Sequence, residues 1–135
     1  MAELSDYFEN VIINLMRNVD YVEGLAYVAL FTAVTGLETD APTAEVSGNA
    51  YARQLAGLSA ASGGASSNAA NIVFPTATPA AWGLISHVAL VDHVSNTTWG
   101  TNVHVLMWSP LDTSKQIDAN DTFQINAGDL DVTIA

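Results

Sequence analysis

Glu45-Val-Ser-Gly-Asn-Ala-Tyr-Ala-Arg-Gln54 is the stretch that decides the expected fold. Its residues 46–49 predict a turn, because Gly and Asn tolerate positive φ angles and a Ser side chain can bond its own backbone. The following residues begin a strand that we expect to run to about Leu58. The side chains of this strand should alternate between two faces, with Tyr51, Arg53 and Leu55 on one and Ala52, Gln54 and Ala56 on the other.

Strand-like segments lie on both sides of this stretch. Residues 25–32 are apolar on both faces, which predicts a central strand buried on both sides. Further strands are expected over residues 71–74, 82–92 and 103–108, and Pro110 should end the last of them. In the segment 82–92, Leu84, Ser86, Val88 and Leu90 should share one face. Two loops are expected at residues 35–43 and 111–120.

The C-terminal residues predict a hairpin. Residues 122–126 and 130–134 should form its two strands, joined around Ala127-Gly128-Asp129. In the last strand Leu130, Val132 and Ile134 should face inward, and the acidic residues between them should face water.

One helix is expected near the N-terminus, over residues 4–19. Its apolar residues recur at helical spacing: Leu4, Phe8, Val11, Ile12, Leu15, Met16 and Val19. Ser5 suits the N-cap position, and Arg17 lies near the negative end of the helix dipole. The apolar stripe either packs on the sheet of the same domain or docks on another subunit.

These elements together predict a mainly β fold, an antiparallel β-sandwich or jelly-roll-like domain with one N-terminal amphipathic helix. We assign residues 1–20 to the helix, which packs on the same domain or on a partner subunit. Residues 21–135 form the β-sandwich domain. The spacing of the strands does not fix their order.

The composition narrows the possible partners. Half of the 135 residues are hydrophobic, which excludes ordinary disorder. The formal net charge is −11, so phosphates would repel the chain, and we expect neither nucleic acid nor a membrane as partner. The chain has no cysteine, which excludes disulfides and thiolate metal sites. The acidic start does not resemble a secretory signal.

No motif points to catalysis or to a cofactor. The sequence holds no Gly-x-Ser-x-Gly elbow and no phosphate-binding glycine loop. The spacing of His87, His93 and His104 matches no zinc signature, and Asp118-Ala-Asn-Asp121 lacks the calcium-loop pattern. We therefore expect no enzyme, cofactor or metal. A catalytic pair of carboxylates stays open, because two such acids can lie far apart in sequence.

The ordered series of short motifs resembles a known family. A YVALFT strand at residues 27–32, the EVSGNAYARQ stretch, a Ser/Gly turn at 62–68, an IVFP strand at 72–75 and a Trp-Gly pair follow one another. The series resembles a family of small phage virion proteins whose members are described as tail-fibre-like, head-fibre or capsid decoration proteins. The resemblance covers nearly the whole chain and implies a virion component.

Among virion components, the short helix without heptads favours a capsid decoration or cement protein on the outer capsid surface, which would bridge major capsid proteins. The apolar composition and the resemblance together favour a homotrimer. The alternative is a tail- or head-fibre module that binds host-surface carbohydrate. Arg53 is one of three cations and lies inside a strand, where it pairs with an acid such as Glu45 or anchors a protein interface, in which Arg is enriched. The candidate interface residues are Arg53, Tyr51, Phe8, Ile12 and Trp99, of which Trp99 is the best placed for sugar contact.

Overall fold

Short elements build the chain within the residues that the computed structural model describes, which are 3–21 and 25–134. In chain order they are β1 (Glu3–Leu4), α1 (Asp6–Met16), β2 (Tyr27–Phe31), β3 (Gln54–Leu55), β4 (Ala65–Ser67), β5 (Ile72–Val73), β6 (Gly83–Val91), β7 (Val105–Ile117), β8 (Gln124–Ile125) and β9 (Asp131–Thr133).

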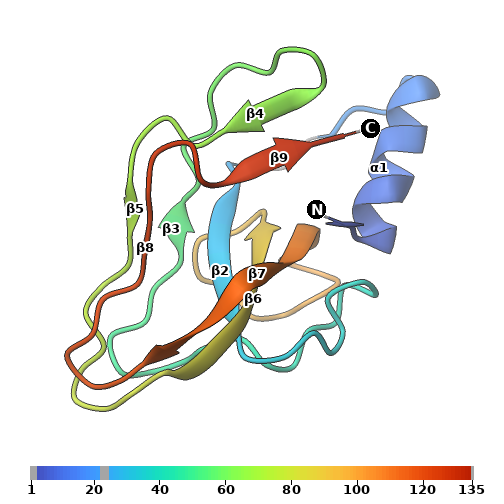
Figure 1. Cartoon of the computed structure of the whole chain (residues 1–135). Helices are drawn as coiled ribbons and strands as arrows, with labels where there is room; N and C mark the ends of the chain where they lie inside the picture. The colour runs from blue at the N-terminus through green and yellow to red at the C-terminus, as the bar shows by residue number, and fades with distance from the viewer. Residues whose placement is uncertain (1–2, 22–24, 135) are drawn as a thin grey trace.

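One antiparallel sheet, in the order β1-β7-β6-β2-β3, forms the centre of the structure. Two small antiparallel pairs, β4 with β9 and β5 with β8, lie beside it (Figure 1). The helix α1 lies at one side of the molecule and contacts β1 and β7 (Figure 1). The prediction of a mainly β, antiparallel, sandwich-like fold with one helix near the N-terminus is confirmed.

The strand β2 separates two hydrophobic cores. Val28 and Leu30 belong to a core that also contains Phe74 and Phe123 from the segments of β5 and β8. Ala29 and Phe31 point to the opposite face, because successive residues of a strand alternate. All four of these β2 residues are fully buried, which confirms the predicted central strand.

The loops around residues 35–43 and 92–104 cover the second face. Leu37 from the first and Val103 from the second are fully buried against Phe31 and Val91. Both segments lack regular secondary structure apart from turns and one isolated bridge, as expected for residues 35–43. At the second segment, the strands predicted over 82–92 and 103–108 extend slightly less far than expected, because β6 ends at Val91 and β7 begins at Val105. Loops complete the core on this face, and strand pairs complete it on the other.

The strand β7 passes through Pro110, so the prediction that this proline ends a strand is wrong, as is the predicted loop at residues 111–120. On one side β7 pairs with β6, and on the other side β1 reaches only Trp108. The β6–β7 register also shifts beside Pro110, between Ile85 and His87. Proline is tolerated in sheets at edges and bulges, and this position offers both.

The predicted C-terminal hairpin is also wrong. The strands β8 and β9 form where expected, but β8 pairs with β5 and β9 pairs with β4. The turn between them is held to a distant segment instead, because the Asn68 side-chain oxygen accepts hydrogen bonds from the backbone N–H groups of Gly128 and Leu130. Within β9 the predicted alternation holds, since Val132 is half-buried and its neighbours are exposed. The prediction that Ile134 faces inward is wrong, because this side chain lies past the end of β9 and is 50% exposed.

Two predicted alternations fail where the backbone is irregular. After the EVSGNAYARQ turn the regular strand is only Gln54–Leu55, and burial falls on Arg53 and Ala56 while Leu55 is half exposed. In β6 the register shift moves Ile85 into the same core as Val88 and Leu90. A bulge adds a residue and reverses the facing of the side chains beyond it.

The helix α1 is shorter than predicted, because Glu3 and Leu4 join the sheet as β1. Ser5 is the N-cap, as expected, and its Oγ accepts a hydrogen bond from the Phe8 N–H at 3.2 Å. The same hydroxyl donates to the carbonyl oxygen of Val105 in β7, so the cap also fastens the helix to the sheet. The helix ends near Asn18, which has a positive φ.

Candidate protein-interaction surfaces

Glu45 and Arg53 from the fold-deciding stretch form a buried ion pair. The Arg53 Nε and Nη2 atoms donate to the two Glu45 carboxylate oxygens at 2.7 Å each. The Arg53 side chain is only 3% exposed and the Glu45 side chain only 12% exposed. Arg53 Nη1 also donates to the backbone carbonyl of His93 at 2.8 Å. The predicted ion pair is confirmed, and it ties the turn–strand unit to the loop after β6.

Tyr51 extends this network toward the central sheet. Its hydroxyl donates to Glu45 Oε1 and accepts from the backbone N–H of Leu30, both at 3.0 Å. Burial, helped by the neighbouring Glu45 carboxylate, raises the pKa of Tyr51 far above its ordinary value of 10.0. The phenol therefore stays neutral and joins the polar network to the backbone of β2.

Trp99 closes the network from the other side. The Arg53 guanidinium carbon lies 4.9 Å from the centroid of the Trp99 ring, within the range of a cation–π contact. Phe31 meets the ring as well, with the two ring centroids 6.2 Å apart. Trp99 is half-buried, so part of its ring is occupied inside the chain. The structure therefore brings Tyr51, Arg53 and Trp99 together: Tyr51 and Arg53 both bind Glu45, and Arg53 contacts the Trp99 ring.

Phe8 and Ile12 lie on α1, apart from that network. Both are half-buried, and Phe8 packs against the main core and meets the edge of Tyr21. The opposite side of the helix faces solvent: Ile13 is 52% exposed and Met16 is 78% exposed. No residue of α1 is fully buried. The five predicted interface residues therefore fall into two groups, and their part in an interface stays a prediction.

A second polar cluster was not predicted. The buried Asp40 receives the backbone N–H of Val105 at 2.6 Å, and its other oxygen lies 2.5 Å from His104 Nδ1. The ring of Tyr7 stacks on His104 with the centroids 3.7 Å apart. His104 is partly buried and hydrogen-bonded. Asp40 lies 64 residues from His104 in the sequence, so no local spacing could have indicated the pair.

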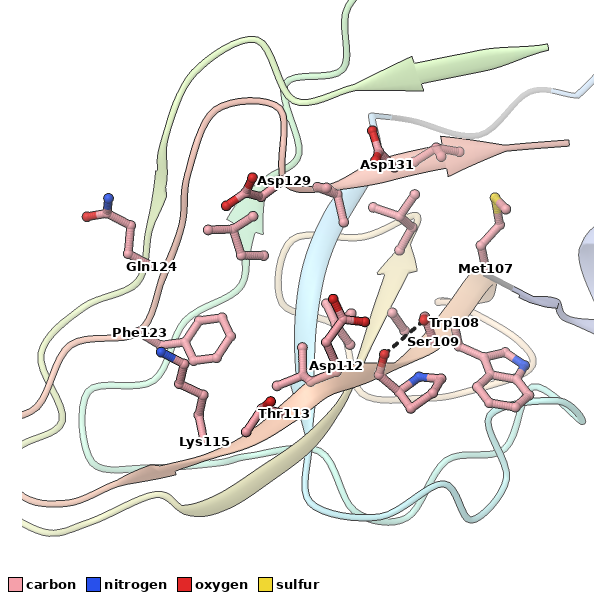
Figure 2. Close-up of a pocket in the computed structure, with 18 of the residues that line it drawn as sticks. Met107, Trp108, Ser109, Asp112, Thr113, Lys115, Phe123, Gln124, Asp129 and Asp131 are labelled. Atoms are coloured by element: carbon pink, nitrogen blue, oxygen red, sulfur yellow. Dashed lines mark hydrogen bonds between the residues drawn. The ribbon is translucent and has the colours of Figure 1, made fainter. Parts of the chain in front are cut away.

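A groove of about 640 Å³ runs between β7 and the segment that leads into β9. Figure 2 shows side chains from β7, β8 and β9 converging on it. Leu111, Leu130 and Val132 supply apolar surface, and Asp129 and Asp131 supply carboxylates. Lys115 is the cation of this lining. We call this feature the β7–β9 groove.

The described residues carry neither a metal cluster nor a membrane-spanning helix. No group of three or more His, Asp or Glu side chains in that part of the chain could hold a metal ion. No helix among the described residues is long and apolar enough to cross a membrane. Desolvation lowers the pKa of His87, a partly buried residue of β6.

A comparison with known families covers nearly the whole chain. A family model described as podophage GP4 fiber I protein gp80 matches residues 3–133. No curated protein matches the chain. The fold and this match define a small, mainly β structural component of a tailed-phage virion. The chain belongs to the podophage GP4 fiber I protein gp80 family.

Proposed function

We propose that this chain is a structural, non-enzymatic subunit of a virion fibre that works by binding other proteins of the particle, including copies of itself in a trimer. The observation that carries the proposal is the family match over residues 3–133, since the family is described as a fiber protein. The resemblance of the EVSGNAYARQ series to small virion proteins points the same way.

The exposed apolar surface of α1 supports a role in assembly. Ile13, Leu15 and Met16 are each about half or more exposed. A helix of eleven residues has only marginal stability in water unless it packs against something. Clustered apolar side chains on a protein surface are typical of contact sites. A partner on this helix would complete its burial.

Localisation in the intact particle tests the proposal. Antibody labelling of an epitope-tagged chain should place it on a fibre, and particles that lack the chain should lose that fibre and adsorb poorly to cells. Their heads should retain DNA as well as wild-type heads do. Label on the capsid surface with normal adsorption would refute the fibre role.

The second candidate function is capsid decoration on the outer surface, bridging major capsid proteins. The net charge of −11 favours an outward position, because carboxylates would be repelled by packaged DNA. A protein that binds only the assembled shell stabilises it by mass action. In that case particles without the chain would release DNA at a lower temperature and still adsorb normally.

If the chain is part of a fibre, the ligand that we propose for it is carbohydrate on the host surface. Trp99 remains the residue to test, although Arg53 and Phe31 occupy part of its ring. A Trp99→Ala particle should adsorb as poorly as a particle without the chain if this residue contacts the sugar. Normal adsorption of a correctly folded Trp99→Ala particle would exclude that contact.

A further inference from the structure

Two apolar surfaces of the described chain have no cover: the outer face of α1 and the β7–β9 groove. The α1 outer face consists of Glu9, Ile13, Met16 and Arg17, which share one side of the helix by their spacing. Its two apolar members are 52% and 78% exposed. Arg17 is exposed, with its Nη1 donating to Asn14 of the same helix at 3.0 Å.

The groove does not suit an added strand. Residues 129–133 are consecutive and all line it, so the groove follows the backbone edge of β9. The opposing strand β7 is irregular. His87 of β6 pairs with Pro110 and Ile85 of β6 pairs with Lys115, so β7 uses more residues than β6 between the same two pairs. A bulge, a proline and a lysine on an edge are features that hinder strand pairing.

The groove does suit a helix. Its volume of about 640 Å³ equals roughly one and a half turns of a helix, taken as a cylinder about 10 Å across that rises about 5.4 Å per turn. The segment from Ile13 to Arg17 makes nearly one and a half turns at about 3.6 residues per turn. The apolar lining of Leu111, Leu130 and Val132 would meet Ile13 and Met16.

We propose that the α1 outer face of one copy docks into the β7–β9 groove of the next copy. The proposal rests on the proposed assembly role and specifies which surfaces of the chain meet. A contact between two different surfaces is heterologous, and repetition of it closes a ring, such as a trimer, or extends a filament. Either outcome suits a fibre.

Charge selects this contact among the possible self-contacts. A chain with a net charge of −11 repels its own copies unless cations lie in the interface. Of its three cations, Arg53 is buried in the pair with Glu45. The other two, Arg17 and Lys115, are exposed, and one lies on the α1 outer face while the other lines the groove. Both exposed cations of the chain therefore fall in the proposed contact.

The charges also match in order along the contact. Figure 2 shows Lys115 toward one end of the groove and Asp131 toward the other. On the helix, Glu9 and Arg17 are eight residues apart, which is about 12 Å at 1.5 Å per residue. In the proposed contact Glu9 faces Lys115 and Arg17 faces Asp131, with the apolar side chains between them.

A charge exchange tests the pairing of Arg17 with Asp131. Sedimentation velocity of the full chain gives the dissociation constant for self-association. Arg17→Glu and Asp131→Lys should each weaken association by about tenfold, because each puts like charges together. The double variant should restore it to within about threefold, because the opposite charges face each other again.

A matched control separates this pairing from general repulsion. Asp131→Lys changes the formal net charge from −11 to −9 and so reduces overall repulsion. Asp118→Lys makes the same change outside the groove lining and should leave association unchanged or tighter. Association weakened equally by Asp118→Lys, or not restored in the double variant, would overturn the proposed contact.

Disulfide trapping tests the geometry directly, because the natural chain has no cysteine. Ile13→Cys chains mixed with Thr113→Cys chains should form a mixed disulfide, since Thr113 lines the groove two residues from Lys115 and Ile13 lies one helical turn from Glu9. Ser114→Cys is the matched control, because Ser114 is exposed but is not part of the lining. Equal trapping at positions 113 and 114 would overturn the contact.

These outcomes are distinct from failure of the fibre role. A chain that labels the fibre and associates without trapping at position 113 overturns the α1–groove contact alone. A chain that labels the fibre but stays monomeric overturns the trimer as well. A chain that shows the charge exchange and the trapping but labels the capsid overturns the fibre role and leaves the contact standing.

Discussion

Removal of the Arg53 guanidinium should destabilise the fold strongly. The change Arg53→Met keeps the length of the side chain but leaves the Glu45 carboxylate, only 12% exposed, without its cation. The His93 carbonyl loses a donor at 2.8 Å as well. Breaking a buried ion pair from one side costs about 3–5 kcal/mol, because the remaining charge stays desolvated.

The cost is large beside the whole stability of a domain, which is about 5–15 kcal/mol. Urea unfolding followed by Trp fluorescence measures it. With an m-value of about 2 kcal/mol per molar, the midpoint should fall by about 2 M. Lys115→Met, a truncation of an exposed cation, should change the free energy of unfolding by less than about 0.5 kcal/mol in dilute solution.

The double variant Arg53→Met/Glu45→Gln decides whether the pair is the cause. It removes both charges, so it should be more stable than Arg53→Met alone, although Tyr51 and His93 still lose polar partners. A loss of less than about 1 kcal/mol in Arg53→Met would refute the reasoning, because it would show that solvent screens the pair as at a surface. Additive effects of the two changes would refute it as well.

Three further variants test other contacts of the fold. Tyr51→Phe removes two hydrogen bonds and should lower the free energy of unfolding by about 1–3 kcal/mol near neutral pH. Because the folded-state pKa of Tyr51 lies above the ordinary 10.0, the wild-type contribution of this residue to stability should be intact below pH 10 and fall above it. The urea midpoint should therefore fall less steeply with rising pH in the variant than in the wild type. Ser5→Ala removes the cap of α1 and should lower the free energy of urea unfolding by about 1–2 kcal/mol. Gly36→Ala puts a Cβ 2.0 Å from the Ala41 carbonyl oxygen and should lower the melting temperature far more than Gly48→Ala, where φ is also positive but the space is open; equal effects would contradict the clash.

The periodicity of the sequence determined the kinds of element and most of their places. Residues 27–31 are apolar without a break, and such a short run rich in β-branched and aromatic residues is typical of a strand buried on both faces. Ser5 at the start of an apolar helical repeat fixed the beginning of α1. The pairing of Glu45 with Arg53 was also within reach, because a cation inside a strand needs an acid nearby.

Tertiary structure alone decided which strands meet and where strands continue. The partner of β8 is β5 and not β9, and β5 lies far from β8 in the sequence, so local turn signals do not describe this pairing. Pro110 lies inside β7 because β1 leaves that edge uncovered, and the extent of β1 depends on Glu3 and Leu4 reaching a strand a hundred residues away. Asp40 and His104 are also far apart in the sequence and meet only in the folded chain. A sequence pattern reports contacts between neighbours in the chain, whereas these contacts exist only once the sheet has assembled.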